Sequence, residues 1–432
     1  MAKNTLDLVN KKVPGFLALS PIAVFLLVYL VSSLVAGDFY KVPVSSAFMV
    51  ASVYAVAITP GKLSSRISVF SQSAGHWNIM LMVWIFILAG AFAGSAKEMG
   101  SIEATVNFTL SIIPVKALLA GLFITACFVS MAIGTSVGTI VALVPIANGI
   151  AQETGLSQPL MAALIVGGSF FGDNLSFISD TTIAATRAVG CEMKDKFKAN
   201  FMIVLPAVLV VTGIYIYKGL NLGVQPDTQS IEWLKLIPYI SVILLAIIGL
   251  DVTLVLFLGI LLNAVIGFIT GSLDWYSLLG SIGNGISGMG DLIIVTLLAG
   301  GMLGLIRQNG GLEYIMKGIV RHVHGRKGAE FGIGLLTGLA NLCTANNTIA
   351  IITVGSIVND ISQKYQISKR RAASLMDIFS CFVQGIIPYG AQLLMAAGLT
   401  GLAASQIIPY LYYPFAAGIC VMLSIILRRK TD

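Results

Sequence analysis

Long apolar stretches, repeated along the chain and separated by short polar loops, constrain the fold of this sequence most strongly. A helix needs about 20 mostly apolar residues to cross a bilayer. Only 10% of the 432 residues are charged and 57% are hydrophobic, whereas about a quarter of residues are charged in soluble domains. We therefore expect an all-α polytopic membrane protein with the lipid bilayer as its surroundings.

Ten stretches are long and apolar enough to predict membrane-spanning helices. They cover approximately residues 15–35, 43–58, 76–96, 160–186, 201–217, 233–250, 252–269, 292–305, 372–399 and 407–427. The stretches 160–186 and 372–399 are too long for one plain span and are polar at their centres, so we expect broken helices there. The polar start of the chain and its long first apolar stretch favour a first span over a cleavable signal peptide.

Two further apolar regions, 115–151 and 331–359, are interrupted by small polar residues. The first interruption is Gly134-Thr135-Ser136-Val137-Gly138-Thr139, and the second is Thr344-Ala345-Asn346-Asn347-Thr348. Each region is either two full spans or a helical hairpin that enters the membrane and returns. The polar tips favour re-entrant hairpins, because irregular backbone at membrane depth is tolerated where it is buried or lines a cavity.

The net charge of +7 does not indicate a nucleic-acid partner, because the basic residues lie in short loops between apolar stretches. With a cytoplasmic N-terminus and two re-entrant hairpins, 21 of the 26 Lys and Arg residues lie on the cytoplasmic side. The five on the other side are Lys41, Lys97, Lys116, Lys218 and Lys235. The positive-inside rule therefore predicts a multi-pass protein of the bacterial inner membrane with both termini in the cytoplasm.

The chain resembles itself at an offset near 210 residues. Leu88-Ala89-Gly90 recurs as Leu298-Ala299-Gly300, and Gly94 recurs as Gly304. An odd number of predicted crossings separates the copies, so the second copy is inverted relative to the first. We expect two inverted repeats, residues 1–218 and 219–432, each with one hairpin and one broken helix around a site near the middle of the membrane.

The two hairpin tips and the two helix breaks supply the candidate site. The expected cation- or proton-binding residues are Asp173, Asn174, Ser176, Ser179, Asp180, Thr181, Thr135, Ser136, Gly138, Thr139 and Asp377. The expected ion- or substrate-binding residues of the second repeat are Thr344, Ala345, Asn346, Asn347, Thr348, Gln384, Pro388, Tyr389 and Gln392. Carbonyls at the end of a half-helix, with hydroxyl and amide oxygens, suit Na⁺, whereas amides at a half-helix N-terminus suit a carboxylate.

Carboxylates within membrane spans are costly, which makes them functional candidates. Asp173 and Asp180 are seven residues apart and would share one face of a continuous helix. Asp180 precedes two threonines, so capping of a helix is its alternative role. Asp377 lies before the second break, and its sequence favours an ion-binding role and a structural role equally.

With these motifs in view, the chain resembles the NhaC family of Na⁺/H⁺ antiporters, within the ion-transporter superfamily. The resemblance covers about residues 84–398 and rests on Gly172-Asp173 with Ser179-Asp180-Thr181-Thr182, on the first hairpin tip, and on Pro388-Tyr389-Gly390-Ala391-Gln392. It implies a scaffold with a transport domain that moves like an elevator, a homodimer, and Na⁺ at the tips and breaks. Phe177 stands where the family pattern has proline, and an aromatic ring there could line a solute pocket.

Two functions remain open from the sequence. The first is Na⁺/H⁺ antiport by alternating access, and the second is Na⁺-coupled transport or exchange of a small amino acid or organic acid on the same scaffold. We expect a transporter and not an enzyme, with Na⁺ as its only metal, no cofactor, and Na⁺ and H⁺ as transported or coupling ions.

Overall fold

The computed structural model describes residues 15–35, 43–177, 179–220, 222 and 231–427, and every regular element in these ranges is helical. The first half holds α1 (Gly15–Val35), α2 (Val44–Ile58), α3 (Leu63–Ala74), α4 (Trp77–Met99), α5 (Ser101–Ile112), η1 (Val115–Ala117), α6 (Leu118–Ile133), α7 (Ser136–Thr154), α8 (Gln158–Leu175), α9 (Asp180–Val189) and α10 (Met193–Leu220). The second half holds α11 (Trp233–Ile247), α12 (Val252–Thr270), α13 (Trp275–Gly288), α14 (Gly290–Gln308), α15 (Gly311–His322), α16 (Gly325–Thr344), α17 (Asn347–Lys364), α18 (Lys369–Ile386), α19 (Ala391–Thr400), α20 (Ala404–Ile407), η2 (Ile408–Tyr410) and α21 (Tyr412–Ile426). The expectation of an all-α membrane protein is confirmed.

Seven helical segments of the described residues are long and apolar enough to cross a membrane, or eight if the bent pair α20–η2 and α21 forms one span. Three predicted spans correspond to shorter apolar helices, Gly15–Tyr29, Val44–Ile58 and Trp233–Ile247. The count of ten spans therefore stays a prediction. Helix α13, whose serines and glycines interrupt the apolar pattern, and the short helix α3 were not predicted from the sequence.

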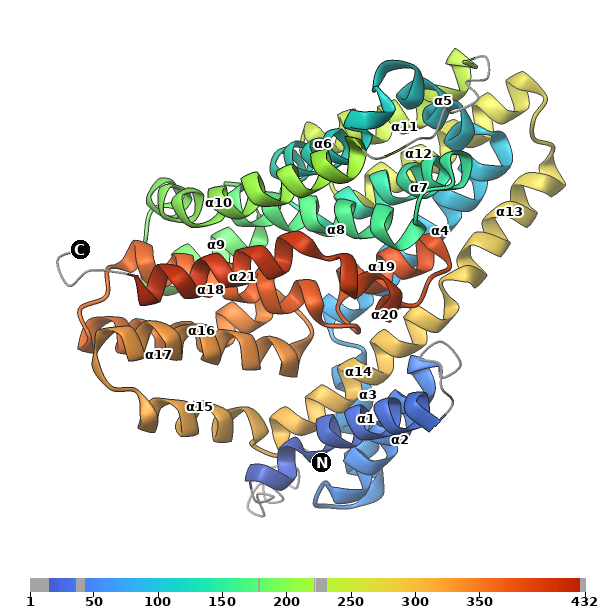
Figure 1. The fold of residues 1–432 in the computed structure, drawn as a ribbon. Helices are drawn as coiled ribbons and strands as arrows, with labels where there is room; N and C mark the ends of the chain where they lie inside the picture. Colours follow the sequence, from blue (N-terminus) through green and yellow to red (C-terminus); the bar gives the residue numbers. More distant parts are fainter. Residues whose placement is uncertain (1–14, 36–42, 178, 221, 223–230, 428–432) are drawn as a thin grey trace.

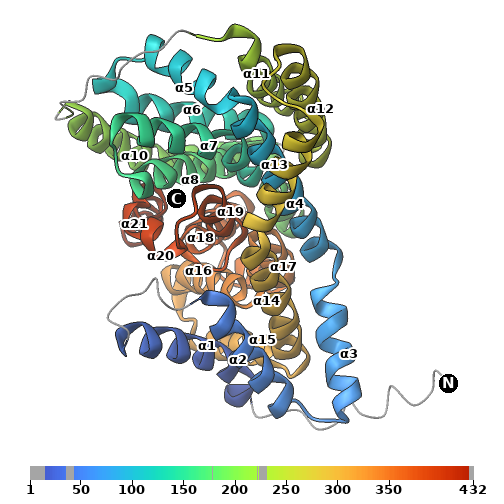
Figure 2. The ribbon, with the colours of Figure 1, turned by 90° about the vertical axis from the view of Figure 1, so that its right-hand side faces the viewer.

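The helices of the two halves follow the same order with similar lengths. Adding 210 to the bounds of α5 gives those of α15, and adding 211 to the first residue of α7 gives that of α17. Packing follows the same correspondence, because α4 lies against α12 and α13 while α14 lies against α2 and α3 (Figure 1). In Figure 2, α11 and α12 lie at the opposite end of the molecule from α1 and α2.

Glycines bring the backbones of α4 and α13 into close contact. A Cβ atom on Gly285 would overlap the backbone of Gly90, and a Cβ on Gly94 would overlap the carbonyl of Ser281. A Cβ on the repeated Gly304 would overlap the side chain of Ser73 in α3. Small residues at helix crossings permit this approach in membranes, which explains why the glycines recur in both halves.

Both predicted hairpin regions consist of two helices joined by a very short turn. The first turns at Gly134, whose φ is +78°, and the second turns at Ala345, whose φ is +50°. Each first arm is tied to a long helix by a side chain that donates to a carbonyl: Ser130 Oγ to Ser169 O at 2.6 Å, and Asn341 Nδ2 to Ser380 O at 2.7 Å. Left-handed backbone at both turns thus supports two equivalent tips.

The two long polar stretches are broken as predicted. The chain leaves helix between α8 and α9 and again between α18 and α19. Helices of one half pack on breaks of the other, since α7 lies against α19 and α17 lies against α9. These contacts between the two halves bring the two hairpin tips and the two helix breaks together at the centre of the molecule.

Candidate functional site

A cavity of about 180 Å³ lies where the four interruptions meet, and we call it the central cavity. Its lining residues come from α4, both hairpin tips and both helix breaks: Asn78, Leu81, Met82, Ile85, Phe86, Gly134, Thr135, Ser136, Val137, Asp173, Asp180, Thr181, Asn346, Asn347, Thr348, Gln384, Ala391, Gln392 and Met395. Ten of them are site residues predicted from the sequence. The cavity is smaller than the roughly 300 Å³ at which pockets for drug-sized ligands begin, so its volume suits a small ion with water or a small organic solute.

Four helices begin at the central cavity. The first residues of α7, α9, α17 and α19 are Ser136, Asp180, Asn347 and Ala391, and all four line it. A helix N-terminus carries a partial positive charge and unpaired amide donors. The cavity wall therefore stabilises negative charge, whether it belongs to the protein's own carboxylates or to a bound anion.

Asp173 places a carboxylate in this wall. It lies in the last turn of α8, its side chain is 4% exposed, and its Oδ1 accepts a hydrogen bond from the Ser136 amide at 3.0 Å. The preceding Gly172 allows the close approach, because a Cβ there would overlap Ser130 in α6. The carboxylate thus rests at the positive end of α7 while remaining next to the cavity.

Asp180 is the second carboxylate of the central cavity. The Ser179 hydroxyl, and not Asp180, caps α9 by accepting from the Thr182 amide at 3.3 Å. The alternative that Asp180 serves as the cap is therefore wrong. Its charge lies in the first turn of the helix, where it is favoured by the helix dipole.

The second half contributes amides instead of carboxylates. Gln384 Nε2 donates to the Ala345 carbonyl at 3.1 Å and to Gln392 Oε1 at 2.9 Å. Gln392 Nε2 then donates to Ser136 Oγ at 3.0 Å, which links the second tip to the first. This chain of hydrogen bonds orients both glutamines along the wall of the cavity and joins the two halves of the protein.

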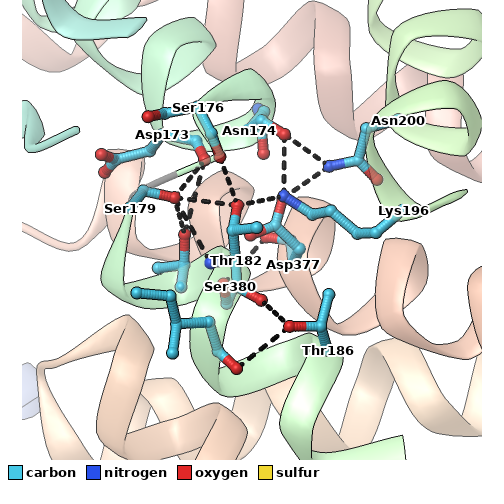
Figure 3. A network of polar contacts seen from close by, with 12 residues as sticks. Asp173, Asn174, Ser176, Ser179, Thr182, Thr186, Lys196, Asn200, Asp377 and Ser380 are labelled. Atoms are coloured by element: carbon cyan, nitrogen blue, oxygen red, sulfur yellow. Dashed lines mark hydrogen bonds and ion pairs between the residues drawn. The ribbon is translucent and has the colours of Figure 1, made fainter. Parts of the chain in front are cut away.

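A polar network lies behind the cavity, at the C-terminal end of α8 (Figure 3). Lys196 of α10 and Asp377 of α18 form an ion pair of 2.9 Å with side-chain exposures of 1% and 0%. Lys196 Nζ also donates to the Asn174 carbonyl at 2.8 Å, as does Asn200 Nδ2 at 2.7 Å. Asp377 therefore faces a lysine and an asparagine of α10, and it does not line the central cavity.

Other predicted residues support the site from outside the cavity. Ser179 Oγ donates to the Asp173 carbonyl at 2.9 Å, and Asn174 Nδ2 donates to Tyr413 OH at 2.9 Å. Thr139 Oγ1 donates within its own helix to the Thr135 carbonyl at 3.1 Å. The predicted residues absent from the cavity lining are Gly138, Thr139, Asn174, Ser176, Ser179, Asp377, Thr344, Ala345, Pro388 and Tyr389.

Phe177 is not a lining residue of the central cavity, so the structure corrects this expectation. Its side chain is 46% exposed, and its ring stacks on Phe197 with centroids 4.7 Å apart. The phenylalanine at this position therefore contacts α10 beside the break.

Sequence reasoning missed two parts of the site. Asn78 and four apolar residues of α4 line the central cavity. The sequence indicates this only through Asn78 itself, a polar residue near the start of an apolar stretch. Lys196 was assigned to a cytoplasmic loop, whereas it is buried in α10. The spacing of Lys196 and Asn200, which puts both on one face of a helix, could have revealed the second part.

Two larger cavities lie beside the central one. The Arg307 vestibule, about 660 Å³, is lined by Gly300, Gly304, Arg307, Leu312, Glu313 and others, and the Lys97 vestibule, about 550 Å³, by Gly90, Gly94, Lys97, Ile102, Glu103 and others. Each of the five residues named for the Lys97 vestibule lies 210 positions before its counterpart in the Arg307 vestibule. A narrow space of about 20 Å³ shares lining residues with both the central cavity and the Arg307 vestibule. In the described part of the chain, the Lys97 vestibule shares none with the central cavity.

Comparison with known proteins identifies the family. A model described as the Na⁺/H⁺ antiporter family matches residues 10–220 and 229–428. The malate-2H⁺/Na⁺-lactate antiporter of Bacillus subtilis is 23% identical over 79% of this chain and 80% of its own length. The Na⁺/H⁺ antiporter NhaC of Alkalihalophilus pseudofirmus is 20% identical over 79% of this chain and 80% of its own length. The arginine/ornithine antiporter ArcD of Halobacterium salinarum is 21% identical over 72% of this chain and 70% of its own length. Because the model matches nearly the whole chain, this protein belongs to the Na⁺/H⁺ antiporter family of membrane transporters.

Proposed function

We propose that this protein exchanges Na⁺ for H⁺ by alternating access and that Asp173 binds the two ions in turn. The observation that carries the proposal is a buried carboxylate that lines the central cavity at the N-terminus of α7. A carboxylate removed from water binds either a proton or a cation, because an uncompensated charge there is costly. Competition for one carboxylate couples the movement of Na⁺ to that of H⁺.

Neighbouring oxygens provide further ligands for a hard cation. Asp180 and the side-chain hydroxyls of Thr135, Ser136 and Thr181 belong to residues that line the same cavity. Hard cations prefer oxygen ligands. In this proposal Asp180 adds a second negative charge, which raises the affinity for a cation and compensates the positive charge of that cation in the occupied site.

Exchange of a small organic acid or amino acid is the second candidate function. The observation that favours it is the meeting of four helix N-termini at the central cavity, because such ends bind carboxylates. The second half contributes the amide side chains of Gln384 and Gln392, whose hydrogen bonds would fix the orientation of a carboxylate. A relative named for malate and lactate, and another named for arginine and ornithine, support this candidate.

Transport in proteoliposomes distinguishes the two functions. The purified protein is reconstituted with a pH-sensitive dye inside, and a Na⁺ gradient is imposed without any organic solute. Proton movement under these conditions supports Na⁺/H⁺ exchange. Proton movement that requires malate, lactate or an amino acid, with uptake of the labelled solute, establishes the second function and refutes simple exchange.

We further propose that residues 1–218 and 219–432 are inverted repeats in a ten-span topology with two re-entrant hairpins. The matching helix bounds and the paired vestibules support this arrangement. The family resemblance suggests an elevator movement of a transport domain within a homodimer of the bacterial inner membrane. With both termini in the cytoplasm, the Arg307 vestibule faces the cytoplasm, and the central cavity lies close to it.

Labelling tests this topology. In a background without native cysteines, Gln308→Cys in the Arg307 vestibule should react with a membrane-impermeant maleimide only in inside-out vesicles. Gln152→Cys in the Lys97 vestibule should react only in right-side-out vesicles. Reaction of both cysteines from the same side would refute the proposed sidedness.

A further inference from the structure

The ammonium group of Lys196 has a complete set of oxygen partners within the protein. It contacts the Asn174 carbonyl at 2.8 Å, Thr182 Oγ1 at 2.6 Å and Asp377 Oδ2 at 2.9 Å. An ammonium has three donors, so these three acceptors satisfy it fully. A carbonyl, a hydroxyl and a carboxylate are also the ligand types that a hard monovalent cation prefers.

The place of this ammonium in the fold is that of a cation at a broken helix. Asn174 lies in the last turn of α8, where carbonyls have no partner in their own helix and the helix dipole is negative. Thr182 follows across the break, and Asp377 comes from the other half (Figure 3). In transporters with broken helices, such half-helix C-termini coordinate the coupling ion.

A second donor, the side-chain amide of Asn200, shares the oxygens that the ammonium contacts. Asn200 Nδ2 donates to two of the same oxygens, the Asn174 carbonyl at 2.7 Å and Asp377 Oδ2 at 2.6 Å. Oδ1 of Asn174 and Oδ1 of Asn200 are buried without a hydrogen-bond partner among the described residues. The Asn174 carbonyl and Asp377 Oδ2 therefore each accept from two donors, and Asn200 would still hold both oxygens in place if the ammonium were removed.

We propose that the Lys196 ammonium is a tethered cation that fills a cation site formed by Asn174, Thr182 and Asp377, so that the exchangeable cation binds only in the central cavity. This inference deepens the proposed function by limiting the number of transported cations. Its central claim is that removal of the ammonium alone opens the Asp377 site to Na⁺. That claim does not require the natural protein to bind Na⁺.

The variant Lys196→Met tests the claim, because methionine keeps nearly the same length of side chain and lacks the charge. We expect the purified, detergent-solubilised full chain of this variant to bind one more ²²Na⁺ per protein than the natural chain. Its melting temperature should rise by about 3 °C or more when choline chloride is replaced by NaCl. Lys198→Met, an exposed lysine on the same helix, should match the natural chain in both measurements.

The double variant Lys196→Met/Asp377→Leu separates a cation site from a structural ion pair. It should fold in choline and bind the same number of Na⁺ ions as the natural chain, because the carboxylate is gone. Recovery of folded Lys196→Met only in NaCl would support the proposal. Two results would overturn the proposal: folded Lys196→Met that binds no additional Na⁺, or Lys196→Met that does not fold in either salt while the double variant folds. If the natural chain binds no Na⁺ at all, that result refutes only the proposed function.

Discussion

Replacement of Asp173 by asparagine removes one negative charge from the central cavity and changes little else. Asparagine keeps an oxygen in the position that accepts from the Ser136 amide at 3.0 Å, so the contact between α8 and α7 persists. Two unit charges 4 Å apart interact with about 4 kcal/mol at an effective dielectric constant of 20. That constant suits a side chain that is 4% exposed beside a small cavity.

The free energy converts directly into affinity for the cation. A loss of about 4 kcal/mol corresponds to nearly a thousandfold weaker binding, and even half of it corresponds to about 30-fold. Part of the Coulomb energy is offset, because a neutral site no longer bears the cost of burying a carboxylate. We therefore expect Asp173→Asn to weaken Na⁺ binding by about 30-fold or more.

Equilibrium binding of ²²Na⁺ to the purified protein measures this effect. Asp360→Asn, an exposed carboxylate of α17 outside the central cavity, is the matched control and should bind Na⁺ as the natural chain does. Size-exclusion profiles and melting temperatures of both variants establish that they fold. Binding by Asp173→Asn within about threefold of the natural affinity, a difference of less than 1 kcal/mol, would refute the assignment of Asp173.

Three further changes test the packing and the polar contacts. Gly285→Ala should destabilise the protein by about 1–3 kcal/mol, because the added Cβ meets the backbone of α4. Gly283→Ala, on the same helix but in open space, should keep or raise the melting temperature. Arg371→Met should lower the melting temperature, because it removes the 2.9 Å ion pair with Glu330, whose side chain is 1% exposed. Arg371→Met/Glu330→Gln should regain part of the loss. Gln392→Leu should weaken binding of the transported ion or solute about tenfold at unchanged protein yield, since two hydrogen bonds along the cavity wall are lost, and unaltered transport kinetics would contradict this.

The orientation of the half-helices divides the central region into two electrostatic environments. The N-termini of α7, α9, α17 and α19 line the cavity, where Asp173 and Asp180 supply negative charge. At the C-terminal end of α8, the carbonyl of Asn174 contacts Lys196 behind the cavity. The positive helix ends of the first half therefore lie beside carboxylates, whereas those of the second half line the cavity together with amide side chains.

The hydropathy pattern was sufficient for the all-helical class, for the positions of both helix breaks and for both hairpin tips. Each of these features follows from local chemistry, since polar and glycine-rich residues interrupt an apolar helix wherever they occur. The expectation drawn from the family pattern, that Phe177 lines a solute pocket, was not met, because its side chain packs on Phe197 beside the break. An aromatic residue in a polar motif does not reveal which direction it faces, because that depends on the neighbouring helix.

The amino-acid sequence by itself determined that this chain crosses a membrane, where its helices break, and which polar residues stand at those breaks. Only the tertiary structure decided which of these residues share a cavity, because α7 pairs with α19 and α17 with α9 across the two halves. It also decided the role of Lys196, which the sequence places near a loop and the fold buries against Asp377. Charge and polarity are local properties of a chain, whereas the partner that neutralises a buried charge comes from residues far away along it.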